Sequence, residues 1–333
     1  PGKALYAVKA NPHPAVLKTL WTSGVRNFDV ASTREVDLVQ SVVPGAKLFF
    51  MHPVKSRAAI RHAYECGVRD FSFDTADELQ KMLEVTGYAD DLTLHLRVAL
   101  PKGGAAMPLS GKFGADRDQA IELLAEARRH ASKLGVTFHV GSQCLEISDY
   151  DTALAYVRSI VEASGIEIDS IDCGGGFPVP YPGMSPRPMS EYFSAIRSSL
   201  SAHGFAGLQV LGEPGRALCA QGGSTLARVE LRKGGDLYLN DGSYGSLFDA
   251  AQCAWKFPVK LHTVEPRDEA ENEAFRFFGP TCDSLDVMNG PFELPDDVQE
   301  GDWVEICHLG AYGQALSSRF NGFYSETTVA VMA

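Results

Sequence analysis

The stretch NFDVASTREVDLVQSVVPGAKLFFM, residues 27–51, reads as a strand, a helix and a second strand. Apolar and aromatic residues in Asn27–Val30 and Lys47–Met51 predict the two strands. Between them, the apolar spacing in Thr33–Val42 predicts a helix. Strands that alternate with helices in this way are typical of a parallel sheet.

The same alternation continues on both sides of this stretch. Further strands are predicted at Leu5–Val8, Arg69–Phe73, Leu92–Ala99, Val136–Val140, Ile168–Asp172 and Leu208–Leu211. Helices are predicted at Ala76–Thr86, Arg117–Leu134, Tyr150–Ala163 and Ser190–Ala202. Eight such units in about 220 residues indicate a (β/α)8 TIM-type barrel, which we favour over a doubly wound open sheet.

The pattern changes after Gln221-Gly222-Gly223, where turns replace the helices between strands. Strands are predicted there at Leu226–Leu231, Asp236–Leu239, Val259–Val264, Phe275–Phe278, Trp303–Ile306 and Thr327–Val331. We therefore expect an α/β chain of two domains, a barrel over residues 1–222 and a mainly antiparallel β domain over residues 223–333. A length of 333 residues accommodates two domains.

The composition excludes several classes of protein. A net charge of −12 disfavours nucleic acid and anionic membranes as partners. No apolar run approaches the roughly 18 residues of a membrane span. The seven cysteines lack CxxC pairing, which indicates free thiols in a reducing cytoplasm and predicts no metal site. Because a strand begins almost directly after Pro1, we expect the natural protein to have further N-terminal residues.

Polar residues and glycines lie at the ends of six predicted barrel strands. Lys9 follows the first strand, Asp29 ends the second, Arg97 lies in the fifth, His139 in the sixth, Gly174–Gly176 follow the seventh and Glu213 follows the eighth. Active sites of (β/α)8 barrels lie at the carboxyl ends of the strands. We therefore expect these residues to meet in one site.

Each of these residues also has a structural explanation. Lys9 could be an exposed lysine before a turn, Gly174–Gly176 a tight turn, and His139 a buried core histidine. Glu213 and Arg216 could form an ion pair. Taken together, however, a reactive amine, a flat ring, a carboxylate and a glycine-rich phosphate loop describe a pyridoxal phosphate site. We expect this cofactor.

Five motifs in order resemble a known family. They are YAVKAN at residues 6–11, HVGS at 139–142, GGGFP at 174–178, EPGR at 213–216 and GPTCD at 279–283. Together they resemble the pyridoxal-phosphate-dependent decarboxylases of basic amino acids with the alanine racemase fold (fold type III), and within these most closely the ornithine decarboxylases. The resemblance spans nearly the whole chain.

The resemblance implies a role for each site residue. Lys9 would hold the cofactor as a Schiff base, with Asp29 and Glu35 near it. His139 would stack on the pyridine ring, Glu213 would keep the ring nitrogen protonated, and Arg97 would support the ring environment. The residues implied for the phosphate are Ser142, Gly175, Gly176, Arg216 and Tyr312.

The resemblance also implies a homodimer with shared active sites, each completed by residues of the partner copy. Cys282 would reprotonate the α-carbon after carbon dioxide leaves, and Asp283 would bind the distal ammonium of an amino acid substrate. We also expect Tyr244 and Asp249 to bind substrate. Ornithine enzymes carry a second substrate aspartate at the position where this chain has Cys253. Asp249 is the carboxylate that lies nearest to this position in the sequence.

These features predict decarboxylation of L-ornithine to putrescine in polyamine biosynthesis. Lysine decarboxylase is the second interpretation, because the substrate loop departs from the ornithine pattern. Diaminopimelate decarboxylase fits the partner loop less well, and alanine racemase lacks the Glu-Pro-Gly-Arg and Cys-Asp pairing. A non-catalytic binding protein similar to antizyme inhibitors is the remaining alternative, although Lys9, His139 and Glu213 are all present.

Overall fold

The computed structural model describes residues 2–101 and 111–331. The chain divides into two compact units. The first comprises Pro1–Pro178 and Pro186–Leu218, and the second comprises Val179–Ser185 and Cys219–Ala333.

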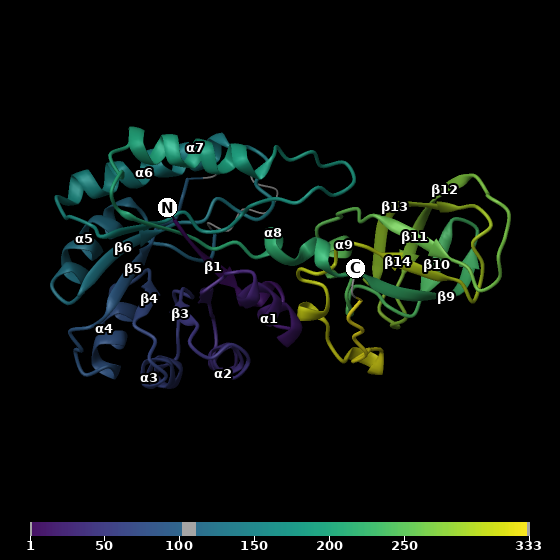
Figure 1. Cartoon of the computed structure of the whole chain (residues 1–333), viewed down its shortest axis with the longest axis horizontal. Coiled ribbons are helices and arrows are strands. Elements are labelled where there is room, and N and C mark those ends of the chain that lie inside the picture. The colour runs from purple at the N-terminus through teal and green to yellow at the C-terminus, as the bar shows by residue number, and fades with distance from the viewer. Residues whose placement is uncertain (1, 102–110, 332–333) are drawn as a thin grey trace. The chain divides into compact units, whose positions relative to one another are not determined.

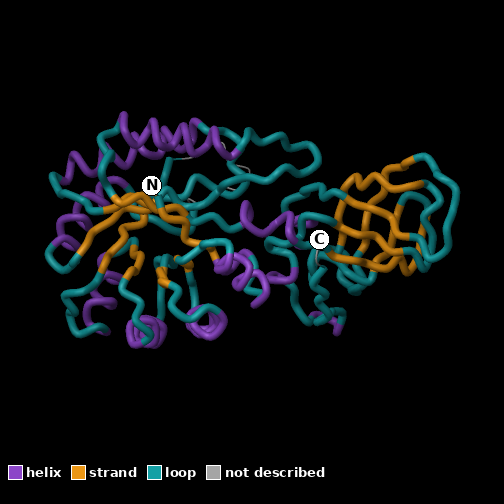
Figure 2. The backbone as a smooth tube through the Cα atoms, viewed as in Figure 1, coloured by secondary structure: helices purple, strands orange, loops and turns teal. Residues whose placement is uncertain are grey.

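The first unit is a closed barrel of eight parallel strands, as predicted. The strands are β1 (Lys3–Ala7), β2 (Asn27–Asp29), β3 (Lys47–Phe50), β4 (Asp70–Phe73), β5 (Thr93–Arg97), β6 (Lys133–Thr137), β7 (Ser170–Asp172) and β8 (Gln209–Gly212). Pairing of Lys3 with Leu211 closes β8 onto β1. Figure 2 shows these strands in orange with helices around them.

Helices connect successive strands on the outside of the barrel (Figure 1). They are α1 (Pro14–Thr22), α2 (Thr33–Val42), α3 (Arg57–Glu65), α4 (Ala76–Val85), α5 (Arg117–Arg128), α6 (Ser148–Ser164), α7 (Met189–Ala202) and the short α8 (Arg216–Cys219). The side chains of Ser32, Ser56 and Thr75 accept backbone N–H bonds at the starts of α2, α3 and α4. Such caps satisfy amides that the helix leaves unpaired, and so fix where each helix begins.

The predicted boundary between the fifth helix and the sixth strand was wrong. The helix α5 ends at Arg128 rather than at Leu134, and β6 covers Lys133–Thr137 rather than Val136–Val140. Backbone bonds explain the difference, because Ser132 N–H bonds Leu92 O at 2.8 Å and Leu134 N–H bonds the Asp169 carboxylate at 2.8 Å. These contacts draw the segment into the sheet, where apolar periodicity alone had extended the helix.

The second unit contains a six-stranded, mainly antiparallel sheet in the order β11-β14-β9-β10-β12-β13. The strands are β9 (Thr225–Lys233), β10 (Asp236–Leu239), β11 (Val259–His262), β12 (Asn272–Phe278), β13 (Val287–Pro295) and β14 (Trp303–Ile306). One neighbouring pair, β10 with β12, is parallel. A short helix, α9 (Phe248–Gln252), follows β10.

The predicted last strand was also wrong. Residues Thr327–Val331 form no strand in the described part of the chain, and Val329 and Val331 are 75% and 89% exposed. Alternating valines favour an extended strand, but a strand also needs a neighbouring strand to bond with, and this pattern does not predict one. The sheet instead uses β13, which was not predicted from the sequence and which contains Pro291 and Pro295, residues that disfavour strands. In the described residues, no helix is long and apolar enough to cross a membrane.

Candidate active site

Lys9 lies directly after β1, in the one-turn helix η1 (Val8–Ala10). The loop after β8 is attached at the same place, because Ala7 N–H donates to Pro214 O at 3.1 Å. The positive charge of Lys9 lowers the pKa of Asp29 and of Glu213, and therefore lies close to both. The structure thus brings together predicted residues from β1, β2 and β8 at the carboxyl end of the barrel.

Two buried carboxyl groups dominate the electrostatics of this end. Burial, and then the charge of Glu213, raises the pKa of Asp29 to about 7, although a bond from the Met51 backbone opposes this. Burial, and then the charge of Asp172, raises the pKa of Glu213 to about 8. Near neutral pH these carboxyls therefore retain protons, and a cationic or proton-bearing ligand would relieve the cost of ionising them.

Asp172, the last residue of β7, is a third buried carboxyl that the sequence analysis did not single out. It accepts a 2.9 Å bond from Gly174 N–H and a hydrogen bond links it to Glu213, which requires a proton on one of the two carboxyls. Burial raises the pKa of Asp172 to about 6. An acidic residue at a strand end, separated by Cys173 alone from three glycines, was the available signal.

His139 lies in the loop after β6 and carries a neutral ring. Burial first, then the charges of Arg97 and Lys9, holds the His139 pKa well below its ordinary range. Its Nδ1 accepts a 2.9 Å bond from Gly141 N–H, so the ring proton belongs on Nε2. A neutral, oriented imidazole of this kind suits contact with a flat protonated ring, because it adds no charge repulsion.

The loop after β7 packs tightly against the loops after β6 and β8. A Cβ at Gly175 would lie 2.6 Å from Glu213 O and 3.1 Å from His139 Nε2, so only glycine fits there. Cys144 N–H bonds Gly176 O at 2.9 Å, which ties the two loops together beside Ser142. Gln143 has φ +56°, a strained conformation of the kind that gathers at ligand sites.

In the second unit, the structure brings Tyr244 and Asp283 together. The Tyr244 hydroxyl donates to Asp283 Oδ2 at 2.5 Å, and this bond holds the pKa of Asp283 below its ordinary value. Cys282 is exposed, and its backbone N–H bonds Asn321 Oδ1 at 3.2 Å. The loop between β12 and β13 therefore presents a thiol beside a carboxylate that stays ionised.

Comparison with known proteins identifies the family. The family described as pyridoxal-dependent decarboxylase, pyridoxal binding domain, matches residues 1–220. Its C-terminal sheet domain matches residues 150–310. The chain belongs to the pyridoxal-dependent decarboxylases. It is therefore a pyridoxal-phosphate-dependent carboxy-lyase, of the group whose members act on basic amino acids.

Three relatives illustrate the similarity. The lysine/ornithine decarboxylase of Selenomonas ruminantium is 33% identical over 97% of this chain and 82% of its own length. The structure of a lysine/ornithine decarboxylase from Vibrio vulnificus complexed with putrescine has a TM-score of 0.82 at 33% identity, covering 97% and 85%. The arginine decarboxylase of Paramecium bursaria Chlorella virus has a TM-score of 0.84 at 28% identity, covering 97% and 88%.

The barrel end fits the cofactor of this decarboxylase family. Glu213 is buried and its raised pKa lets it share a proton with a ring nitrogen. Gly175 lets the loop after β7 lie directly against Glu213 O and His139 Nε2, the two residues proposed to contact the ring. Arg216, buried at the start of α8, supplies a guanidinium suited to phosphate. Amine, carboxyl, glycine loop and guanidinium therefore all belong to one unit.

Two aspartates that the sequence analysis missed shape the second-unit loops of the decarboxylase. Asp286 accepts bonds from Ser243 N–H at 2.7 Å and from the Thr281 hydroxyl at 2.7 Å, so it links the loop after β10 to the loop after β12. Asp241 accepts a 2.6 Å bond from the Ser246 hydroxyl. An Asp-Gly pair marked Asp241 as a turn residue, but no local pattern marked Asp286.

Two further predicted substrate or phosphate residues, Asp249 and Tyr312, lie in the second unit, whereas Glu35 lies on α2 in the first, where the charges of Asp29 and Lys9 act on it. Asp249 is buried in α9, and Cys253 is the half-buried residue that ends this helix. Tyr312 has φ +57°, which is uncommon for a bulky side chain. Such an outlier persists only where the surrounding structure imposes it.

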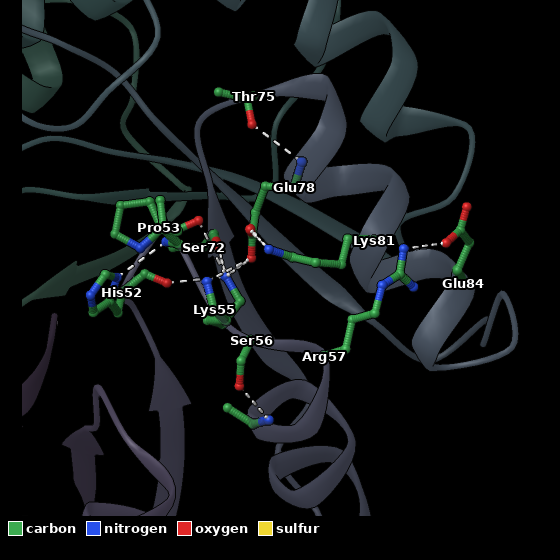
Figure 3. A network of polar contacts seen from close by, with 12 residues as sticks. His52, Pro53, Lys55, Ser56, Arg57, Ser72, Thr75, Glu78, Lys81 and Glu84 are labelled. Carbon is green, nitrogen blue, oxygen red and sulfur yellow. Dashed lines mark hydrogen bonds and ion pairs between the residues drawn. The ribbon is translucent and has the colours of Figure 1, made fainter.

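A buried ion-pair network joins Lys55, on the loop after β3, to Glu78 on α4 (Figure 3). Lys55 Nζ lies 2.9 Å from Glu78 Oε1 and donates to Ser72 O at 2.5 Å. Burial lowers the pKa of Lys55 to about 8 despite the Glu78 charge. Burial first, and then the charges of Lys55 and Lys9, lowers the pKa of His52 in the same loop.

We expect Lys55→Met to reduce the free energy of unfolding by about 3 kcal/mol, because the buried Glu78 carboxylate loses one of its two ammonium partners and keeps only Lys81. Urea denaturation measures this. The matched control is Arg57→Ala, which removes the exposed 2.7 Å pair with Glu84 in the same region and should cost less than about 1 kcal/mol (Figure 3). Equal effects of the two substitutions would contradict a buried, stabilising pair.

Proposed function

We propose that the protein decarboxylates L-ornithine to putrescine, as a step of polyamine biosynthesis. One observation carries the choice of a diamino acid: Tyr244 holds the Asp283 carboxylate at 2.5 Å and keeps it ionised. A fixed anion of this kind pairs with the distal ammonium of such a substrate. The Selenomonas relative, named a lysine/ornithine decarboxylase, and the Vibrio structure with putrescine support the same substrate class.

The barrel residues have separate roles in this proposal. Bound pyridoxal phosphate supplies the electron sink that decarboxylation needs. Lys9 provides the amine that holds the cofactor aldehyde, Glu213 keeps a proton against the ring nitrogen, and His139 packs its neutral ring against the pyridine. Asp29 and Arg97 set the charge around these groups. Phosphate ligands in the proposal are Ser142, Gly175, Gly176, Arg216 and Tyr312.

Lysine is the second candidate substrate. Its side chain is one methylene longer than that of ornithine, and one methylene changes discrimination by only about 10–200-fold. Cys253 stands where a carboxylate is expected for ornithine, and Asp249 is buried within α9. If Asp283 is the single carboxylate that binds the distal ammonium, it would discriminate less between substrates of different chain length than two carboxylates would.

A competition experiment tests the substrate. The cofactor-loaded protein receives an equimolar mixture of L-ornithine, L-lysine, L-arginine and meso-diaminopimelate, and mass spectrometry identifies the products. Putrescine in excess is the expected result. Cadaverine, agmatine or lysine in excess would show that the preferred substrate is lysine, arginine or diaminopimelate, respectively. The reaction would still be a decarboxylation. Absence of any product would instead favour a binding protein without catalytic activity.

We further propose a cytoplasmic homodimer in which Cys282 and Asp283 act in the active site of the partner copy. The seven free cysteines support a reducing compartment. Exposure of Cys282 on a loop held by Asp286 suits a residue that serves another copy. Activity should fall on dilution and return on concentration, and activity per protein that stays constant from nanomolar to micromolar concentration would argue against sharing.

We expect Cys282→Ala to retain bound cofactor while slowing turnover by about 10²-fold or more, because it removes the acid that protonates the α-carbon. Part of the product would then be an aldehyde, with the substrate's α-amino group left on the cofactor, because the proton would go to the cofactor carbon instead of the α-carbon. Amine and aldehyde yields from ornithine measure this. Cys307→Ser, at a half-buried thiol in the same unit, is the control. Normal turnover with amine alone would remove Cys282 from the mechanism.

A further inference from the structure

Three metal-ligating side chains converge on the outer surface of the barrel, between α2 and α3. Asp37 lies on α2, His62 on α3, and Cys66 directly after α3. One ligand atom from each lies within 4.8 Å of the other two. Figure 1 shows α2 and α3 as neighbours outside the barrel strands, so this cluster does not belong to the active site.

The same ring nitrogen faces both other groups. His62 Nε2 lies 2.6 Å from Asp37 Oδ1 and 3.7 Å from Cys66 Sγ. A catalytic relay would need the carboxylate on one ring nitrogen and the thiol on the other. Here one ring nitrogen lies near both groups, and the three donor atoms lie within 4.8 Å of one another, as the ligands of one metal ion would.

The spacing suits a tetrahedral transition metal. Zinc binds imidazole nitrogen at about 2.0 Å and thiolate sulfur at about 2.3 Å, which places the two ligands roughly 3.6 Å apart. The observed separation of His62 Nε2 and Cys66 Sγ is 3.7 Å. The Asp37 carboxylate, on an exposed side chain, needs to withdraw by less than about 1 Å to complete a third position.

The cluster is held in place by the two helices. His62 and Cys66 are four residues apart and so lie on one face at the end of α3. Gln40 on α2 donates to Cys66 O at 2.7 Å, which links the helices a second time. The carboxylates of Asp37 and Glu65 both act on Cys66, so the surroundings are negative and favour a cation.

We propose that Asp37, His62 and Cys66 form a binding site for a divalent transition metal of the zinc type, with water in the fourth position. On binding, Cys66 loses its thiol proton to solvent and His62 keeps its remaining proton on Nδ1. The metal ties α2 to α3. The sequence analysis predicted no metal site, because Asp37 lies 25 residues before His62 and only the fold joins them.

Cobalt substitution tests the site on the cofactor-loaded protein. Co²⁺ in a tetrahedral site with thiolate gives visible d–d bands at longer wavelengths than the cofactor absorbs. We expect one Co²⁺ to bind, to be displaced by Zn²⁺, and to lose its tetrahedral bands in Cys66→Ser, with affinity at least about tenfold weaker. Cys307→Ser, which alters a thiol in the other unit, should leave the bands unchanged.

A second measurement needs no variant. Zn²⁺ should slow alkylation of Cys66 in the wild-type protein, as measured by peptide mass spectrometry, while the alkylation rate of Cys307 stays constant. If Co²⁺ shows no tetrahedral bands, or if the bands persist in Cys66→Ser, the proposal is wrong. Equal alkylation of Cys66 with and without Zn²⁺ would also overturn it.

Discussion

Substitution of Lys9 by alanine should abolish decarboxylation almost completely, by roughly 10⁴-fold or more, as expected when a group that bonds covalently to the reacting system is removed. Lys9 follows β1 at the carboxyl end of the barrel, and its charge lowers the pKa values of Asp29 and Glu213. Its charge therefore acts on the carboxyl that is proposed to keep a proton against the cofactor ring. Amine release from ornithine under saturating cofactor measures the loss.

Lys9→Arg separates the two contributions of this lysine. Arginine keeps a positive charge near Asp29 and Glu213 but cannot form a Schiff base with the cofactor aldehyde. We expect Lys9→Arg to be as inactive as Lys9→Ala, and neither variant should yield a cofactor-modified peptide after borohydride reduction. The wild-type peptide that contains Lys9 should carry the cofactor. If Lys9→Arg turned over ornithine within tenfold of the wild-type rate, Lys9 would contribute only its positive charge and not a covalent bond to the cofactor.

Sequence patterns predicted the barrel well because each βα unit carries its own signal. Asn27–Asp29, Thr33–Val42 and Lys47–Phe50 lie within the expected segments, since apolar periodicity and the Ser32 cap act locally. The errors arose where long-range pairing decides the structure. Ser132 joins the sheet through Leu92 O, and Thr327–Val331 lacks a strand partner among the described residues. No local pattern contains either fact.

The candidate site was predictable to the extent that its residues follow strands. Lys9, Asp29 and Glu213 lie at strand ends, so the rule for barrel active sites gathers them without knowledge of side-chain contacts. Other groups depend on distant contacts. Lys55 meets Glu78 across 23 residues, and Asp286 meets Ser243 across 43. Buried polar partners of this kind become visible only when the fold brings them together.

The second large effect concerns Glu213. We expect Glu213→Gln to retain cofactor on Lys9 but to lower kcat about 10²–10³-fold, because glutamine cannot carry the charge that holds a proton on the ring nitrogen. Glu213→Asp keeps the charge on a side chain one methylene shorter, and should lose less activity. Steady-state decarboxylation of ornithine distinguishes the variants. Equal activity of Glu213→Gln and wild type would contradict the proposed role.

The same substitution should stabilise the cofactor-free protein, and the effect depends on pH. Burial raises the pKa of Glu213 from 4.5 to about 8, so the folded state retains a proton that the unfolded chain has lost. Wild-type stability therefore falls as pH rises through this window, whereas Glu213→Gln has no such proton to lose. We expect an advantage on the order of 4 kcal/mol for the variant at pH 8, and almost none at pH 4.5. An advantage that is constant with pH would mean that altered packing, rather than ionisation of the buried carboxyl, is the cause. The ionised Glu213 carboxylate would thus destabilise the cofactor-free wild type. A charge that lowers stability in this way is expected where it serves to bind a ligand rather than to stabilise the fold.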